Sequence, residues 1–82
     1  MNNGDKSIFT VEGVVVENLP NTMFRVKLAE RSPADLAGKV ILCHLAGKMR
    51  LHYVKLLPGD SVRIEINKLD YSRGRIVFKI RS

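Results

Sequence analysis

The chain has 82 residues with a formal net charge of +6, a single cysteine and no tryptophan. A chain of this length folds as one domain with a small core, which argues against an enclosed active site of several residues. A single cysteine forms no disulfide within the chain, so a reducing, cytoplasmic setting is expected. No apolar run has the roughly 18 residues of a membrane span or the form of a signal peptide, so no membrane association is expected.

The first elements along the chain are a polar lead and a series of strands. Residues 1–7 are predicted to be a disordered lead and residues 8–82 to form a single domain. Apolar and polar residues then alternate, as they do in a strand with one buried face. Gly13 indicates a bulge, or a sharp coil where a barrel closes. Five strands are predicted, at residues 8–18, 22–29, 39–46, 60–67 and 74–81.

The connection between the second and third strands is long for a hairpin. Ser32 can cap a helical turn, Pro33 suits its first position, and Gly38 can end it. The connection is therefore either a helical turn or an irregular surface loop. In both cases, removal of residues 32–37 is expected to leave the barrel folded.

A short helix is predicted between the third and fourth strands. Met49, Tyr53 and Leu56 recur at helical spacing and indicate one or two turns. Five antiparallel strands with a helix at this position are typical of the oligonucleotide/oligosaccharide-binding (OB) barrel, so an all-β OB-fold is predicted. The alternative is a five-stranded barrel without the helix.

The positive charge is concentrated in the second half of the chain. Residues 1–38 hold four basic and five acidic residues, a net charge of −1, whereas residues 39–82 hold ten basic and three acidic residues, a net charge of +7. Such a basic region favours a nucleic-acid partner over a merely solvated surface.

Strand parity predicts which cations point outward. On the last strand, Ile76, Phe78 and Ile80 are expected to face the core, and Phe9 and Phe24 are also expected there. The cations that parity places outward are Arg25, Lys27, Arg75, Lys79 and Arg81, with Arg73 at the preceding turn, predicted at Tyr71–Gly74.

The segment between residues 48 and 55 adds further candidates. Lys48, Arg50 and Lys55 can attract phosphate, and His52 and Tyr53 can stack on exposed bases. Tyr53 is equally suited to anchor the core.

Metal binding and nucleophilic catalysis are not expected. Cys43 and His44 are adjacent on a strand, so their side chains point to opposite faces and do not converge on one ion. Nothing places an orienting carboxylate for a nucleophile, and Cys43 is expected to be a small buried apolar residue. The protein is therefore predicted to be neither an enzyme nor a cofactor-binding protein.

Four segments, in order and near the family's spacing, resemble the bacterial translation initiation factor one family, over about residues 8–81. These segments are Leu19–Val26, His44–Arg50, Tyr53–Asp60 and Ser72–Lys79. The resemblance implies a monomeric, cytoplasmic, non-catalytic OB barrel that binds the small ribosomal subunit in the decoding region of the aminoacyl site. It also implies contacts with ribosomal RNA and a neighbouring ribosomal protein, a block on premature tRNA binding, and assembly of the initiation complex with the other initiation factors.

The resemblance also implies RNA contacts at particular positions. Met49 is included on the resemblance and on its expected exposure between two cations. The RNA contacts are Arg25, Lys48, Met49, Arg50, Tyr53, Lys55, Arg73, Arg75 and Lys79, with His44, His52 and Arg81 as additional candidates.

The sequence departs from the family in the connection from Ala29 to Lys39, which is longer than the family's short turn. This length indicates a divergent or second copy of the factor, or a lineage-specific insert. Two other functions remain open: a single-stranded RNA chaperone of the cold-shock type, for which surface aromatics are few, and a protein–protein adaptor barrel with an incidental basic surface.

Overall fold

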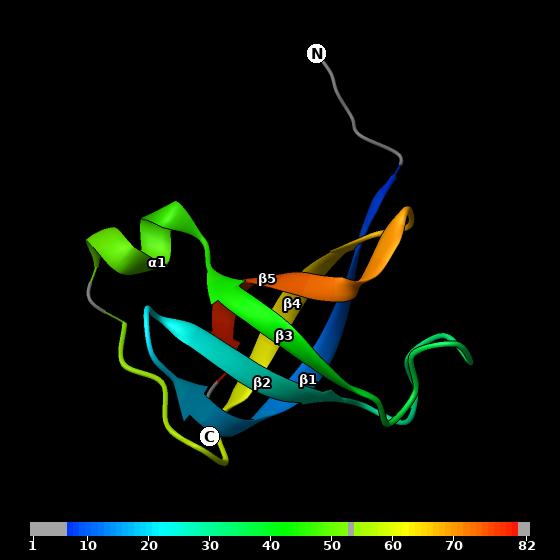
Figure 1. Ribbon diagram of the computed structural model, residues 1–82, viewed down its shortest axis with the longest axis horizontal. Helices are drawn as coiled ribbons and strands as arrows, with labels where there is room; N and C mark the ends of the chain where they lie inside the picture. The colour runs from blue at the N-terminus through cyan, green and yellow to red at the C-terminus, as the bar shows by residue number, and fades with distance from the viewer. Residues whose placement is uncertain (1–6, 53, 81–82) are drawn as a thin grey trace.

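A computed structural model describes residues 7–52 and 54–80, and strands dominate these residues (Figure 1). The predicted lead, apart from Ser7, lies outside the described residues, as do Tyr53 and Arg81. The elements in chain order are β1 (Ile8–Leu19), β2 (Met23–Leu28), β3 (Val40–Leu45), α1 (Gly47–Leu51), β4 (Ser61–Asn67) and β5 (Asp70–Ile80). None of the described helical structure has the length and apolar character required to cross a membrane.

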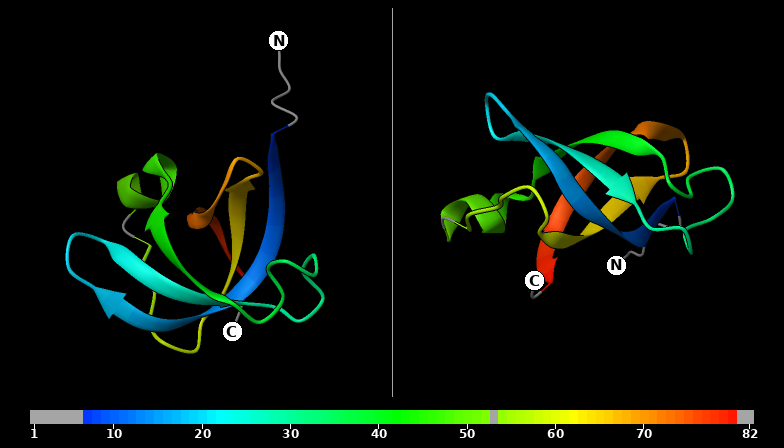
Figure 2. Two further views of the ribbon diagram at one scale, coloured as in Figure 1. Left: turned by 45° about the vertical axis from the view of Figure 1, so that its right-hand side comes forward. Right: turned by 90° about the horizontal axis from the view of Figure 1, so that it is seen from below.

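The strands close into a barrel in the order β1-β2-β3-β5-β4, with β4 paired back onto β1 (Figure 2). This arrangement confirms the predicted all-β OB-fold with a short helix between the third and fourth strands. One pairing differs from the expected antiparallel sheet, because β3 and β5 run parallel. The chain crosses from β3 through α1 to β4, and the β4–β5 hairpin returns it beside β3 in the same direction.

Gly13 lies where β1 pairs with both β2 and β4. A Cβ atom at this position would lie 2.7 Å from both the Lys27 carbonyl oxygen and Val26 Cγ1. The glycine therefore permits the close approach that the coiled strand needs, and the bulge in β1 lies further on, between Val15 and Glu17.

The inward-facing side chains of all five strands form one core. Cys43 is fully buried within it, as predicted, and burial raises the pKa of its thiol to about 12. The fully buried side chains are Val15, Val26, Leu28, Leu36, Cys43, Val62, Ile64, Ile66 and Ile76.

Leu36, from the long connection, belongs to this core and is only 1% exposed. The Pro33 carbonyl accepts hydrogen bonds from the N–H groups of Leu36 (2.7 Å) and Ala37 (2.9 Å), which gives one tight turn but no assigned helix. The alternative of an irregular surface loop is therefore wrong, because the Leu36 side chain packs into the core of the barrel.

The remainder of the connection is tied to the barrel. The Leu28 N–H donates to the Lys39 carbonyl at 2.8 Å, and the Gly38 N–H donates to the Leu28 carbonyl at 3.1 Å. These two hydrogen bonds extend the β2–β3 pairing. Glu12 on β1 bridges Arg31 of the connection and Arg63 of β4. Hydrogen bonds from Arg63 and Arg31 hold the pKa of the Glu12 carboxyl below its usual value.

The predicted turn at Tyr71–Gly74 is wrong, because β5 begins at Asp70. The reversal instead lies at Lys68 and Leu69, where Asn67 Oδ1 accepts the Leu69 N–H at 2.8 Å. Polar residues suggested a turn, but Asp70 pairs with Asn67 across the reversal, and Arg73 and Gly74 pair with β3.

A bulge in β5 reverses the phase of its last residues. Ile64 pairs with Ile76 whereas Arg63 pairs with Phe78, so Val77 is the extra residue. The expectation that Phe78 faces the core is therefore wrong: its ring is 52% exposed, with the Arg63 guanidinium 5.5 Å from its centroid.

Candidate nucleic-acid interface

Cations from β2 and β5, the two strands that flank β3, share the outer face of the barrel. On this face, Arg25 of β2 and Arg73 of β5 pair with Leu42 of β3 from either side. Two residues further along β3, His44 pairs with Arg75 of β5. Cross-strand partners point to the same side of a sheet, so β3 lies at the centre of a basic face.

The helix adds its cations to the end of this face. The Ala46 N–H donates to the Ile76 carbonyl at 2.9 Å, which ties the start of α1 to β5. Lys48 and Arg50 on α1 are exposed, and so is Lys55 in the segment that follows. We call Arg25, Arg73, Arg75, Lys48, Arg50 and Lys55 the basic surface.

Two acidic residues neutralise part of the basic surface. Arg25 forms an ion pair with Glu17 at 3.1 Å, and Arg75 forms one with Glu65. The remaining members, Lys48, Arg50, Lys55 and Arg73, form no ion pair within the described part of the chain. These four cations are therefore available to a polyanion without loss of an internal pair.

His44 lies half-buried among these cations. Its burial, followed by the positive charges of Arg75, Arg50 and Arg73, lowers the pKa of the imidazole below its ordinary value. The ring is therefore neutral at pH 7 and can both donate and accept a hydrogen bond.

Two predicted RNA contacts do not lie on the basic surface. Met49 is only 4% exposed, because its side chain on the inner side of α1 packs into the core, so its expected exposure is wrong. Lys79 does not share the outward direction of Arg75, because the bulge reverses the phase. Its ammonium instead donates to the Lys55 carbonyl at 3.2 Å and lies 3.5 Å from Asp60 Oδ2.

The remaining candidates are more peripheral. His52 is exposed at the C-terminal end of α1. Glu17 and Glu65 were not recognised from the sequence as partners of the cations, because only the strand register reveals which charges meet. Among residues 7–52 and 54–80, no three His, Cys, Asp or Glu side chains form a cluster that could hold a metal ion.

A closed five-stranded barrel with cations gathered on one outer face defines an RNA-binding protein of the OB-fold class. Residues 4–82 match the family model described as translation initiation factor 1A / IF-1. The chain belongs to this family and is a translation initiation factor, which confirms the resemblance found in the sequence.

The solved structures that resemble the barrel include two that differ in chain length. The solution structure of translation initiation factor IF-1 from the Wolbachia endosymbiont strain TRS of Brugia malayi is 34% identical, with a TM-score of 0.69; the match covers 94% of this chain and 83% of that chain. The crystal structure of YjeQ from Thermotoga maritima is 30% identical, with a TM-score of 0.66, and the match covers 89% of this chain but 23% of that chain. The barrel thus occurs both in a chain of similar size and within a much longer one.

Proposed function

We propose that the protein binds the small ribosomal subunit in the decoding region of the aminoacyl site, where it contacts ribosomal RNA and a neighbouring ribosomal protein. Bound there, it blocks premature tRNA binding and assists the other initiation factors in assembling the initiation complex. It acts as a cytoplasmic monomer, through binding alone and without a cofactor or catalysis.

The observation that carries this proposal is the set of cations that form no ion pair among the residues that the structure describes. Lys48, Arg50 and Lys55 lie on one short stretch around α1, and Arg73 lies on the adjoining strand face. Cations so placed neutralise phosphates and release the counterions condensed on RNA, which favours binding. Family membership directs the proposal to ribosomal RNA.

A competition experiment tests the location. The labelled protein is incubated with purified small subunits, with and without a small molecule that occupies the decoding region. Bound protein is expected to fall as the competitor is added. A competitor for a distant site on the subunit is the control and should leave binding unchanged. Binding that neither competitor reduces would contradict the decoding-region site.

The same assay separates the alternatives. An RNA chaperone of the cold-shock type would bind an unstructured RNA as tightly as it binds the small subunit. An adaptor barrel that recognises only protein would bind neither naked ribosomal RNA nor an unstructured RNA. Preference for the small subunit, together with measurable affinity for its RNA, is the expected outcome.

A further inference from the structure

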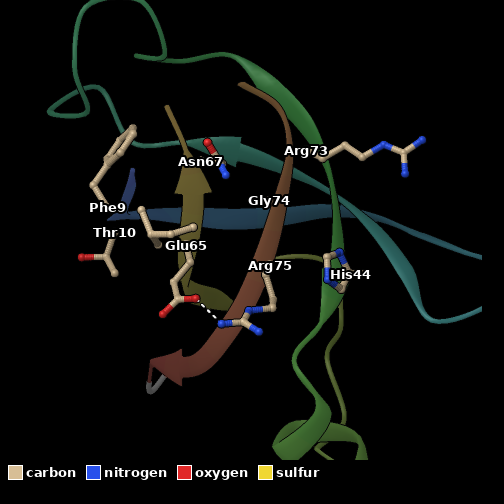
Figure 3. A pocket seen from close by; sticks show the side chains of 9 residues that line it. Phe9, Thr10, His44, Glu65, Asn67, Arg73, Gly74 and Arg75 are labelled. Carbon is tan, nitrogen blue, oxygen red and sulfur yellow. Dashed lines mark hydrogen bonds and ion pairs between the residues drawn. The ribbon is translucent and has the colours of Figure 1, made fainter. Parts of the chain in front are cut away.

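The basic surface has two parts, and strand pairing holds only one of them. Arg73 and Arg75 project from β5, as Figure 3 shows, and the pairing of β5 with β3 fixes their backbone. The other cations lie on the chain between β3 and β4, residues 46–52 and 54–60, which we call the crossover. These cations are Lys48, Arg50 and Lys55. Their positions depend on what attaches the crossover to the barrel.

The beginning of the crossover is attached through α1. The Ala46 N–H donates to the Ile76 carbonyl at 2.9 Å, and Met49 is only 4% exposed because it packs into the core. The Met49 carbonyl in turn accepts the Val54 N–H at 3.1 Å. The cations of α1 lie within this part, so their backbone has a support of its own.

The end of the crossover is held by two side chains that reach it from different strands. Asn18 Nδ2 on β1 donates to the Leu56 carbonyl at 3.0 Å. Lys79 Nζ on β5 donates to the Lys55 carbonyl at 3.2 Å. In the barrel, β4 lies between β1 and β5, so the two donors approach consecutive carbonyls from strands on either side of β4. We call Asn18 and Lys79 the clamp.

The carboxylate of Asp60 orients the Lys79 ammonium. Asp60 Oδ2 lies 3.5 Å from Lys79 Nζ and also accepts the Leu57 N–H at 2.9 Å. The Asp60 side chain is only 13% exposed, so little water competes for these contacts. Its backbone is tied to β1, because the Val15 N–H donates to the Asp60 carbonyl at 2.9 Å. Asp60 thus fixes the ammonium that holds the Lys55 carbonyl.

Lys55 is the cation whose position the clamp sets. Leu56 packs into the core and is 3% exposed, whereas the Lys55 side chain is exposed. Lys55 and Arg50 line the same cavity beside α1, so the clamp decides where Lys55 lies relative to the cations of the helix. A side chain whose backbone is restrained before binding loses less conformational entropy when it meets a phosphate.

We infer that Asn18 and Lys79 are positioning residues, which hold the Lys55 ammonium where it meets an RNA phosphate and do not contact RNA themselves. The inference rests on the proposed RNA-binding function and deepens it, because it replaces the RNA contact that the sequence predicted for Lys79 with a different role. Without the clamp, Lys55 keeps its charge but its backbone is less restrained. Binding is then weaker, although the number of phosphate contacts is unchanged.

Hydrogen exchange of the full chain, followed by nuclear magnetic resonance, tests the clamp without a ligand. Lys79→Met keeps the length of the side chain but removes the donor, so the Leu57 amide should exchange about fivefold or more faster than in the wild type. The Val26 amide, in the centre of β2, should change less than about twofold. Lys79→Arg retains a donor and should behave as the wild type. Unchanged exchange at Leu57, or equal acceleration at Leu57 and Val26, would overturn the inference.

A double-mutant cycle with purified small subunits tests whether Lys79 acts through Lys55. Lys79→Met should weaken binding about fivefold in the wild-type background but less than about twofold in the Lys55→Met background. Lys27→Met makes the same change on an exposed lysine outside the basic surface, and its affinity should stay within about twofold of the wild type. Equal losses from Lys79→Met in the two backgrounds would indicate a direct RNA contact and would overturn the inference.

Salt dependence separates positioning from contact in a second way. Asn18→Ala removes the other donor without a change in charge and should weaken binding about threefold. In Asn18→Ala and Lys79→Met, the slope of log affinity against log salt should stay within about 0.3 of the wild-type value, whereas loss of a phosphate contact would reduce its magnitude by about 0.9. A reduction of that size in Lys79→Met would overturn the inference.

The same titrations distinguish this inference from the proposed function. Wild-type protein that binds small subunits while Asn18→Ala and Lys79→Met retain full affinity would overturn the clamp alone. Wild-type protein that fails to bind small subunits would overturn the proposed function, and the positioning role with it.

Discussion

A single extra residue, Val77, decides which side chains β5 presents to solvent. Before it, the period of two holds, and Arg75 points outward while Ile76 is buried. After it, Phe78 is exposed and Lys79 turns towards Asp60. Parity was therefore reliable for Arg75, before the bulge, and failed for Phe78 and Lys79, after it, because a bulge leaves no periodic signal in the residue types.

The half-buried imidazole of His44 should make the stability of the protein depend on pH. Its pKa in the folded protein lies below the ordinary value of 6.5, chiefly through burial and then through three arginines. The folded state therefore resists protonation, so its stability is full above pH 6.5 and falls as the pH decreases. Chemical denaturation between pH 7 and pH 5 should show this loss, and His44→Gln should reduce it. Equal loss of stability at low pH in the wild type and in His44→Gln would contradict the assignment of this acid sensitivity to His44.

Arg50 and Arg75 test the basic surface. The double variant Arg50→Ala, Arg75→Ala is expected to bind small subunits about tenfold or more weakly, because two charge-assisted contacts are lost. Both residues are exposed, so the thermal unfolding temperature should change little.

The matched control removes the same charge elsewhere. Lys27 and Lys39 are exposed cations that do not belong to the basic surface. Lys27→Ala, Lys39→Ala should weaken binding by less than about threefold. Equal losses in the two double variants would show that net charge, and not its position, governs binding.

At the scale of elements, the long connection between β2 and β3 is part of the fold. Leu36 belongs to the core, so Leu36→Ala is expected to reduce the free energy of unfolding by about 2–5 kcal/mol. Leu69→Ala is the matched control, because Leu69 is 86% exposed and its loss should change the stability by less than about 0.5 kcal/mol. Denaturant titration measures both. A neutral Leu36→Ala would contradict the packing.

Deletion of the connection follows from the same packing. A chain without residues 32–37 loses Leu36 and the turn that holds it, so it should be partly or wholly unfolded by circular dichroism at 25 °C. This reverses the expectation drawn from the sequence, in which polar and small residues around a single leucine gave no sign of burial. A deletion variant that unfolds at the wild-type temperature would show that the connection is dispensable.

The elements themselves were largely predictable. Alternation in β2 and β4 marks half-buried strands, and the predicted bounds agree with the structure to within one residue. The start of β5 was missed, because Asp70 and Ser72 are typical turn residues and the pairing of Asp70 with Asn67 exists only in the folded strand register. The parallel β3–β5 pairing also depends on the whole topology and has no local signal.

At the scale of the whole molecule, the uneven charge predicts a strong salt dependence. Lys48, Arg50, Lys55 and Arg73 form no ion pair in the described part of the chain and should each neutralise about one phosphate. The slope of log affinity for small subunits against log salt should therefore be about −3 to −4 at constant magnesium. Titration between roughly 50 and 300 mM salt measures this slope. A slope near zero would contradict electrostatic binding. The Arg50, Arg75 double variant should show a smaller slope than its Lys27, Lys39 control.

The candidate site was only partly predictable at this scale. Charge and parity identified Arg25, Arg73 and Arg75, but not Glu17 and Glu65, which pair with two of these cations. The type of an acidic residue does not indicate which cation it will meet. Only the strand register places these carboxylates beside Arg25 and Arg75, so the charge available on the basic surface depends on the folded barrel.

The burial of Cys43 turns the only thiol of the chain into a reporter of barrel opening. It has no exposed surface, and its raised pKa leaves almost no thiolate at neutral pH, so an alkylating reagent cannot modify it in the closed barrel. Modification therefore proceeds only through molecules whose barrel has opened. At low reagent concentration, its rate divided by the rate for the unfolded protein gives the fraction of open molecules. The rate of Cys43 alkylation thus measures how often the barrel opens, without any engineered label.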